Sequence, residues 1–336
     1  MISLWYPAEP IQYQRAPYMT ARAAAHFDQG LARFVPRYRV GVMDWAGTPT
    51  HAGIDAPVAP ARGGHPVVLY GPGGGNARTV GTVLVEELAS RGYVAVTVDH
   101  TYESGEVEFP DGRVAVDQRP ADATRGESTT VRVADLRFVV DSLAEIAAGR
   151  SPDVTERPLP TGLRDGLDLS RLGMVGYSAG GYAAAEAMLA DRRIRAGVNL
   201  DGQLLADDDP VVVAPVAQPG LDRPFLQFAV AGHTRESDPS WAAFWMNPRA
   251  WRRELRLAGA THFGLSDLQV ALPAIGQVMG LTTEEVSLAL GSIDPVRSVA
   301  AQRAYVTAFV DRHLRGRRGG LLDHASPRFP EVTFVP

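Results

Sequence analysis

One stretch restricts the fold of this chain more than any other: Gly-Tyr-Ser-Ala-Gly-Gly at residues 176–181. The apolar run 172–175 precedes it, and an alanine-rich segment at 182–189 follows it. This order predicts a strand, a tight turn and a helix, with Ser178 at the apex of the turn. Such a turn needs small residues two positions before and two after the serine, because strand and helix touch there. Glycine stands at both positions.

A turn of this kind has chemical consequences. It exposes the hydroxyl of Ser178 and directs the backbone amide of Ala179 towards a negatively charged reaction intermediate. A glycine-serine pattern also occurs by chance in flexible loops. The predicted strand and helix on either side favour the functional interpretation, so we predict that Ser178 is a nucleophile.

Composition excludes several classes of protein. The 336 residues are 45% hydrophobic and 21% charged, which is typical of one large α/β domain spanning residues 1–336. A net charge of −5 argues against nucleic-acid binding. No apolar run approaches the roughly 20 residues of a membrane span. The chain has no cysteine, which excludes thiolate metal sites and disulfides. We expect neither a metal nor a cofactor.

The first residues bear on localisation. Residues 2–7 read as a strand and lack the charged and apolar regions of a signal peptide. We therefore expect a cytoplasmic protein, or a secreted one if a leader precedes this sequence. No sequence feature predicts the oligomeric state.

Hydrophobic periodicity predicts the order of the elements. Residues 1–60 contain aromatic and proline-rich segments typical of antiparallel edge strands with long loops. Strands and helices then alternate, which indicates a mostly parallel sheet with helices on both faces. A polar loop is expected at 102–126. The predicted strands are 65–70, 93–98, 172–175, 196–200, 224–230 and 254–257, and the predicted helices lie around 80–88, 136–147, 182–189 and 295–315.

Residues 263–291 are rich in Leu, Ala and Val. This composition predicts helices, which either cover the site or belong to the ordinary core.

A second glycine-rich segment, Gly-Pro-Gly-Gly-Gly-Asn at 71–76, follows one predicted strand and precedes a helix. It partly fits a dinucleotide-binding turn, but Asn76 occupies the position of the third glycine. Alternatively, this loop donates a backbone amide to an oxyanion hole opposite Ala179. Only the second interpretation uses both glycine-rich segments, so we favour it.

A serine nucleophile needs a base within hydrogen-bond reach and a carboxylate that orients the base. His262 follows the last predicted strand, where a loop can reach over the carboxyl edge of the sheet. Asp201 and Asp238 each lie near the end of a buried strand, and position alone leaves both open as the acid. Four histidines follow Ser178 in the chain: His233, His262, His313 and His324.

Several short motifs occur in a specific order along nearly the whole chain. They are Leu-Trp-Tyr-Pro-Ala at 4–8, Asp-Ala-Pro-Val at 55–58, the glycine loop followed by Arg78-Thr79, residues 88–93 and 98–100, the Ser178 turn, Asn-Leu-Asp at 199–201, Thr-His-Phe at 261–263 with Ser266-Asp267, and Gly-Ser-Ile-Asp-Pro at 291–295. In this order the motifs resemble the α/β-hydrolases of the platelet-activating factor acetylhydrolase type, plasma and intracellular isoform II, and their bacterial relatives.

The resemblance implies an α/β-hydrolase fold and assigns roles to residues. The nucleophile falls on Ser178, the acid on Asp201 and the base on His262, while Asp238 becomes the alternative acid. The amides of Gly74 and Ala179 would form the oxyanion hole. The chain departs from the family at 71–73, where many relatives carry Ser-His-Gly and this sequence carries Gly-Pro-Gly. A backbone donor is retained there, but any role of that histidine is lost.

The sequence therefore predicts a serine carboxylic-ester hydrolase that works through an acyl-enzyme on a small ester or lipid, with a short acyl group. A lipase or polyester hydrolase with a longer-chain preference is one alternative. A non-catalytic binding protein of the same fold is another. Four aromatic residues are interpreted either as the lining of a substrate pocket or as ordinary packing: Trp241, Phe244, Trp245 and Phe263.

Overall fold

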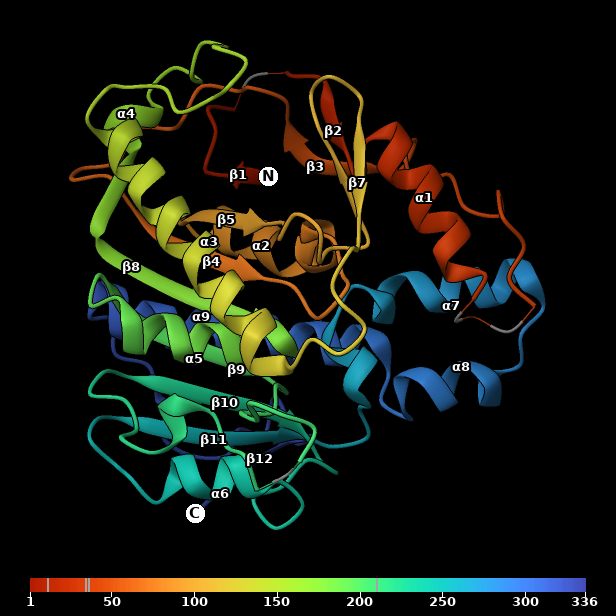
Figure 1. The fold of residues 1–336 in the computed structure, drawn as a ribbon, viewed down its shortest axis with the longest axis vertical. Helices are drawn as coiled ribbons and strands as arrows, with labels where there is room; N and C mark the ends of the chain where they lie inside the picture. The colour runs from red at the N-terminus through yellow and green to blue at the C-terminus, as the bar shows by residue number, and fades with distance from the viewer. Residues whose placement is uncertain (11, 34, 36, 210) are drawn as a thin grey trace.

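The computed structural model describes residues 1–10, 12–33, 35, 37–209 and 211–336, and its centre is an eight-stranded sheet (Figure 1). The six inner strands pair in parallel, while the two outer strands, β1 and β12, pair antiparallel. In sheet order the strands are β1 (Ile2–Trp5), β5 (Val94–Val98), β4 (His65–Gly71), β8 (Leu167–Tyr177), β9 (Ile194–Leu200), β10 (Phe225–Val230), β11 (Arg252–Leu257) and β12 (Val332–Val335).

Helices cover both faces of this sheet, which confirms the predicted mostly parallel α/β architecture (Figure 1). Helices α3 (Arg125–Ala147) and α5 (Ala179–Ala190) lie on one face. Helices α2 (Thr82–Ser90) and α9 (Pro295–Arg315) lie on the other. Every residue of β4, β5 and β10 is buried, because a strand in the middle of a covered parallel sheet has no solvent-facing side.

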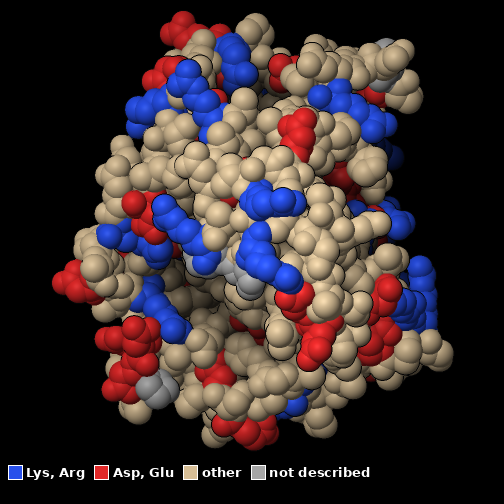
Figure 2. Space-filling model, turned by 90° about the vertical axis from the view of Figure 1, so that its right-hand side faces the viewer, with Lys and Arg blue, Asp and Glu red and all other residues tan. Residues whose placement is uncertain are grey.

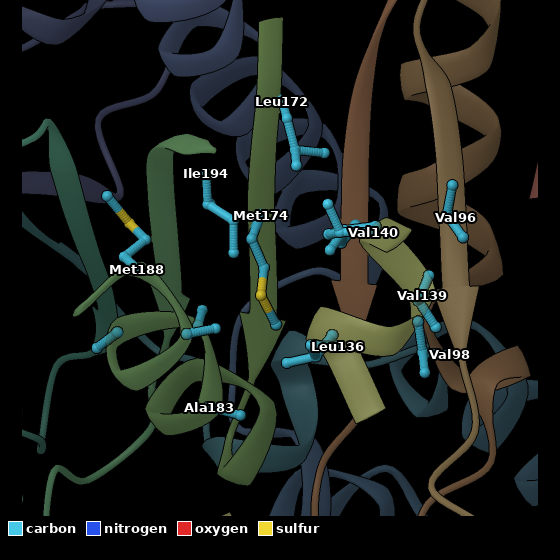
Figure 3. Packing of buried hydrophobic residues seen from close by; sticks show 14 of the residues in the cluster. Val96, Val98, Leu136, Val139, Val140, Leu172, Met174, Ala183, Met188 and Ile194 are labelled. Carbon is cyan, nitrogen blue, oxygen red and sulfur yellow. The ribbon is translucent and has the colours of Figure 1, made fainter. Parts of the chain in front are cut away.

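The core between α3, α5 and the sheet shows how these elements hold one another (Figure 3). Leu136 and Val139 of α3 belong to the same buried cluster as Val96 of β5 and Met174 of β8. Helix α5 contributes small side chains such as Ala183, which is completely buried. Small side chains bring α5 close to the sheet, so the start of this helix is held firmly at the end of β8.

The structure places additional regular elements in two segments that the sequence predicts to be rich in loops, and it adds a strand near the end of the chain. Residues 1–60 contain helix α1 (Ala21–Leu31) and the pair β2 (Arg15–Pro17) and β3 (Pro49–Gly53), and the polar segment 102–126 contains the hairpin β6 (Glu106–Glu108) and β7 (Val114–Val116). Strand β12 was not predicted either. These elements are short or weakly patterned, and tertiary contacts stabilise them. Asp28 of α1, for example, accepts a hydrogen bond from Trp45 Nε1 at 3.1 Å.

The predicted helices within 263–291 are present as η3 (His262–Leu265), α7 (Leu268–Met279) and α8 (Thr283–Leu290). They lie beside α1 in Figure 1 and form a third buried cluster with the N-terminal segment, in which Leu272 and Ile275 meet Ala24 and Trp45. The hydroxyl of Tyr18 also donates to the buried carboxylate of Asp267 at 3.2 Å. Residues 263–291 are therefore packed against the first fifty residues, and whether they cover the site stays a prediction.

Among the described residues, no helix has both the length and the apolar character that crossing a membrane requires.

The turn between β8 and α5 has the predicted close contacts. Ser178 adopts φ 55° and ψ −122°, a backbone conformation that residues with a side chain rarely adopt. A Cβ atom at Gly176 would lie 1.9 Å from the carbonyl oxygen of Gly180. A Cβ atom at Gly180 would lie 2.0 Å from the carbonyl oxygen of Gly71. Only glycine fits at either position, since the clashing atoms belong to the backbone.

We expect Gly180→Ala to lower the free energy of unfolding by about 3 kcal/mol, because the new methyl group must push β4 and α5 apart. Urea unfolding followed by circular dichroism measures this change. The control is Gly30→Ala in α1, where a methyl group meets nothing within 4 Å and should raise the stability by about 0.5 to 1 kcal/mol. Equal effects of the two substitutions would contradict the steric argument.

Candidate active site

Three side chains meet at the carboxyl edge of the sheet. Ser178 follows β8, Asp201 follows β9 and His262 follows β11. His262 Nε2 lies 2.9 Å from Ser178 Oγ, and His262 Nδ1 lies 2.6 Å from Asp201 Oδ2. With the proton on Nδ1, His262 donates to Asp201, and its Nε2 accepts from the Ser178 hydroxyl. The arrangement has the order and connectivity of a nucleophile, a base and an orienting acid.

Asp201 is held by its own loop. The backbone of Asp201 has a φ of 59°. The fully buried side-chain amide of Asn199 closes the turn, because it donates to Gly202 O and accepts from Gly202 N, both at 2.7 Å. The amide of Val230 donates to Asp201 Oδ1 at 3.1 Å. Burial opposes the charge of this carboxylate, but hydrogen bonds from His233 and His262 outweigh it and lower the pKa of Asp201. Asp201 is therefore ionised and fixed in orientation.

His262 is positioned from the opposite side. The hydroxyl of Tyr177 donates to the backbone oxygen of His262 at 3.1 Å, and the two rings lie 5.0 Å apart. The Thr261 hydroxyl, in turn, donates to the carbonyl of Ala289 at the end of α8. The His262 side chain is 40% exposed, so it faces the solvent side of the site while its backbone is held by buried groups.

Gly74 and Ala179 lie on either side of Ser178. A Cβ atom at Gly74 would be 3.8 Å from Ala179 Cβ, so the two peptides face each other closely. Neither amide donates a backbone hydrogen bond among the described residues. Both amides are therefore available as hydrogen-bond donors, and their role in an oxyanion hole stays a prediction from the family resemblance.

A buried ion pair fixes the loop that carries Gly74. Arg132 of α3 is 1% exposed and pairs with Glu103 through hydrogen bonds of 2.6 and 2.7 Å. Its guanidinium also donates to Pro72 O at 2.6 Å and to Gly73 O at 3.1 Å. The sequence reasoning missed this pair. The available signal was an arginine on the same helical stripe as Leu136 and Val139.

A cavity of about 690 Å³ opens beside Ser178. Figure 2 looks onto the side of the molecule where the parallel strands end, and shows a hollowed face with arginine side chains beside it. Most of the lining residues have polar or charged side chains, although apolar atoms contribute slightly more of the lining surface than polar atoms do. The lining comprises Gly74, Glu103, Arg119, Ala123, Thr124, Arg125, Ser128, Thr129, Arg132, Ser178, Ala179, Tyr182, Asp201, Gln203, Val230, Gly232, His233, Ser237, Asp238 and His262.

The four aromatic residues predicted to line a substrate pocket do not line this cavity. Trp241 and Phe244 are buried in the core on one face of the sheet, so the packing interpretation holds for them. The guanidinium groups of two arginines, one of them Arg252 at 4.1 Å, lie over the ring of Trp245. Phe263 is 52% exposed beside His262.

The alternative acid, Asp238, does not contact His262. Its Oδ2 lies 2.6 Å from Nε2 of His233, and Nδ1 of His233 lies 2.9 Å from Asp201 Oδ1. The structure thus joins Asp238, His233, Asp201, His262 and Ser178 in one hydrogen-bonded row. The sequence reasoning named His233 among the downstream histidines and gave it no role.

Comparison with known proteins agrees with this geometry. The sequence model of the family described as "Platelet-activating factor acetylhydrolase, isoform II" matches residues 4–318. The chain belongs to this family. A probable 1-alkyl-2-acetylglycerophosphocholine esterase of Arthroderma benhamiae is 30% identical over 288 residues, which cover 81% of this chain and 66% of that protein. The platelet-activating factor acetylhydrolase of the dog is 22% identical over 77% of this chain and 60% of its own length.

A solved structure is similar over the full length. The ferulic acid esterase of Streptomyces cinnamoneus shares 34% identity with a TM-score of 0.76, and the match covers 100% of this chain and 88% of that one. The α/β-hydrolase fold expected from the sequence is therefore confirmed. The chain spans only 66% and 60% of the lengths of the two curated relatives, so their activity is not transferred to it directly.

Removing the buried cation should destabilise the protein. We expect Arg132→Met to lower the free energy of unfolding by about 3 kcal/mol, because the buried carboxylate of Glu103 loses its two short hydrogen bonds and keeps only the longer contact of 3.5 Å with the partly exposed Arg119. The matched control is Arg150→Met, whose partner Glu145 is exposed, and which should leave the unfolding midpoint unchanged. Urea titration of both variants measures the difference. A midpoint of Arg132→Met equal to that of the wild type would contradict the assigned role.

Proposed function

We propose that this protein is a serine carboxylic-ester hydrolase whose nucleophile is Ser178, base His262 and orienting acid Asp201. One observation carries the proposal: these three side chains are hydrogen-bonded in sequence on a strained turn at the floor of a cavity. Membership of the acetylhydrolase family and the likeness to a ferulic acid esterase support the same chemistry.

The geometry accounts for each step. Ser178 Oγ attacks the ester carbonyl carbon while its proton moves to His262 Nε2. The amides of Gly74 and Ala179 bind the oxygen that becomes negative. His262 then protonates the departing alkoxide, which leaves the acyl group on Ser178. A water molecule, deprotonated by His262, hydrolyses the acyl-enzyme, and Asp201 stabilises the imidazolium in both halves of the reaction.

The scarcity of large aliphatic side chains in the lining of the cavity favours a small ester. Apart from the alanines, the apolar contacts available there are the ring of Tyr182 and the side chain of Val230. A buried methylene contributes about 0.8 kcal/mol only where it meets apolar surface, and contact with arginine and carboxylate groups requires their desolvation. We therefore propose short acyl groups. A lipase or polyester hydrolase would need a long apolar groove that this lining does not provide.

One experiment distinguishes an enzyme from a non-catalytic binding protein of the same fold. A fluorophosphonate probe should label the wild type and not Ser178→Ala, and Ser178→Ala should lower kcat for p-nitrophenyl acetate by about 10,000-fold or more. Ser170→Ala is the control, because Ser170 is an exposed serine at the other end of β8. If the folded Ser178→Ala variant were still labelled, the proposed mechanism would be contradicted.

The acyl-length preference is tested separately. We expect kcat/KM for p-nitrophenyl esters to rise slightly from acetyl to about butyryl and to drop beyond, because longer chains must displace packed polar groups at about 1 to 3 kcal/mol. The measurement uses ester concentrations below micelle formation. A maximum at eight carbons or longer would defeat the short-acyl proposal and favour a lipase.

A further inference from the structure

We propose that His233 is a positioning residue for this reaction: a doubly protonated imidazole that bridges Asp201 and Asp238 and fixes both the orientation and the effective charge of Asp201 towards His262. The inference rests on the proposed function for its effect on turnover. The bridge itself stands on geometry and can be tested without a substrate.

Both ring nitrogens of His233 face carboxylate oxygens. Nδ1 lies 2.9 Å from Asp201 Oδ1, and Nε2 lies 2.6 Å from Asp238 Oδ2. A neutral imidazole carries only one N–H, so one of its nitrogens would present a lone pair to a carboxylate. The imidazolium donates at both ends. Two carboxylates on opposite sides of one ring therefore select the charged form.

The surroundings favour the same state. The His233 side chain is 12% exposed, and its two partner carboxylates are almost completely buried. The ring centroid lies 4.2 Å from that of Trp241, a distance at which an indole attracts a cation. The indole N–H of Trp241 donates to Gly202 O at 2.8 Å, directly after Asp201. Trp241 thus supports the bridge from one side and the Asp201 turn from the other.

Asp238 is a rigid anchor for the bridge. It is the N-cap of α6 (Pro239–Trp245), and its Oδ1 accepts from Ser240 N at 2.9 Å and from Ser240 Oγ at 2.6 Å. The remaining oxygen faces His233. His233 therefore connects helix α6 to the end of β9, in addition to the direct hydrogen bond from Trp241 to Gly202 O.

The titration behaviour agrees with this geometry. Burial by itself would lower the pKa of His233, but its hydrogen bonds to Asp201 and Asp238 outweigh burial and raise this pKa to about 9. The pKa values of both carboxylates are lowered despite their burial, chiefly by their hydrogen bonds to His233. His233 consequently stays protonated at neutral pH.

The bridge has two consequences for the reaction. His233 and the Val230 amide occupy Asp201 Oδ1, which leaves Oδ2 for His262. The positive charge of His233 also offsets part of the negative charge that Asp201 presents to His262. Other titratable or charged groups near this row are Tyr177 beside Asp201 and, across the cavity, Glu103, Arg119, Arg125 and Arg132.

Three variants separate the electrostatic role from a structural one. His233→Gln removes the positive charge and keeps hydrogen-bonding capacity. Asp238→Asn removes a negative charge and leaves an amide oxygen for His233 Nε2. The double variant has the same formal charge as the wild type. Asp201→Asn serves as the reference for loss of the acid itself.

We expect His233→Gln to lower kcat/KM about 10- to 100-fold at neutral pH, mainly through kcat, since a charge-assisted hydrogen bond to the acid is lost. The acidic limb of its pH profile should move up by about 0.5 to 1 pH unit, because loss of a neighbouring cation makes the hydrogen-bonded row more negative and favours the binding of a proton there. Asp238→Asn should move the limb in the opposite direction, and the double variant should return it close to the wild-type position.

A merely structural role would lower the unfolding temperature of all three variants and leave the acidic limb in place. That result, or shifts of His233→Gln and Asp238→Asn in the same direction, would overturn the proposal. If kcat/KM fell no more in Asp201→Asn than in Asp238→Asn, the acid would be misassigned. That result would count against the proposed function as well.

Nitrogen-15 spectra of the histidine rings test the bridge without turnover. At pH 8 the wild type should show one ring with both nitrogens protonated, titrating near pH 9, and this signal should be absent from His233→Gln. Neutral rings for all eight histidines at pH 8 would overturn the inference even if the protein proves to be an esterase. The signal in a protein without esterase activity would support the bridge and reject the proposed function.

Discussion

The close contact between β8, the turn at Ser178 and α5 is the constraint on which the rest of the site depends. Gly176 and Gly180 have no room for a side chain, because strand, turn and helix approach at backbone distance. This contact forces Ser178 into its unusual φ and raises its hydroxyl above the sheet. It also places the Ala179 amide at the start of α5. The nucleophile, one oxyanion donor and the helix are thus positioned by a single packing requirement.

Buried charges organise the two flanks of that turn. On one side, the pair between Arg132 and Glu103 holds the carbonyls of Pro72 and Gly73, so the oxyanion loop is tied to α3. On the other side, His233 joins Asp201 to the cap of α6. The charged side chains of Arg132 and His233 are costly to bury unless every hydrogen-bond partner is in place. The residues around each of them supply those partners. The site is therefore rigid where the reaction needs fixed groups and open where a substrate enters.

The loop at 71–74, proposed to form part of the oxyanion hole, is supported in a way that the resemblance did not imply. Gly-Pro-Gly stands at 71–73, where the family resemblance leads one to expect Ser-His-Gly. A histidine side chain is absent there, yet the loop is held from below by Arg132 through two backbone carbonyls. Support through the backbone does not depend on the side chain at that position. The cavity beside this loop is lined by few large aliphatic side chains, which is the basis of the proposed preference for small esters.

The sequence by itself determined the α/β architecture, the strand-turn-helix at Ser178 and the candidacy of His262, because periodicity and glycine spacing are local properties of the chain. It left Asp201 and Asp238 open until a family resemblance separated them, and it gave no role to His233. Only the tertiary structure decided these roles, since hydrogen bonds between loops after different strands have no local signature. For the same reason α1, the β6–β7 hairpin and β12 escaped prediction: contacts far along the chain stabilise them. Trp241 packs on His233 and lies outside the cavity, because the direction of α6 in space turns that side chain into the core. The spacing of residues along the chain does not encode this direction.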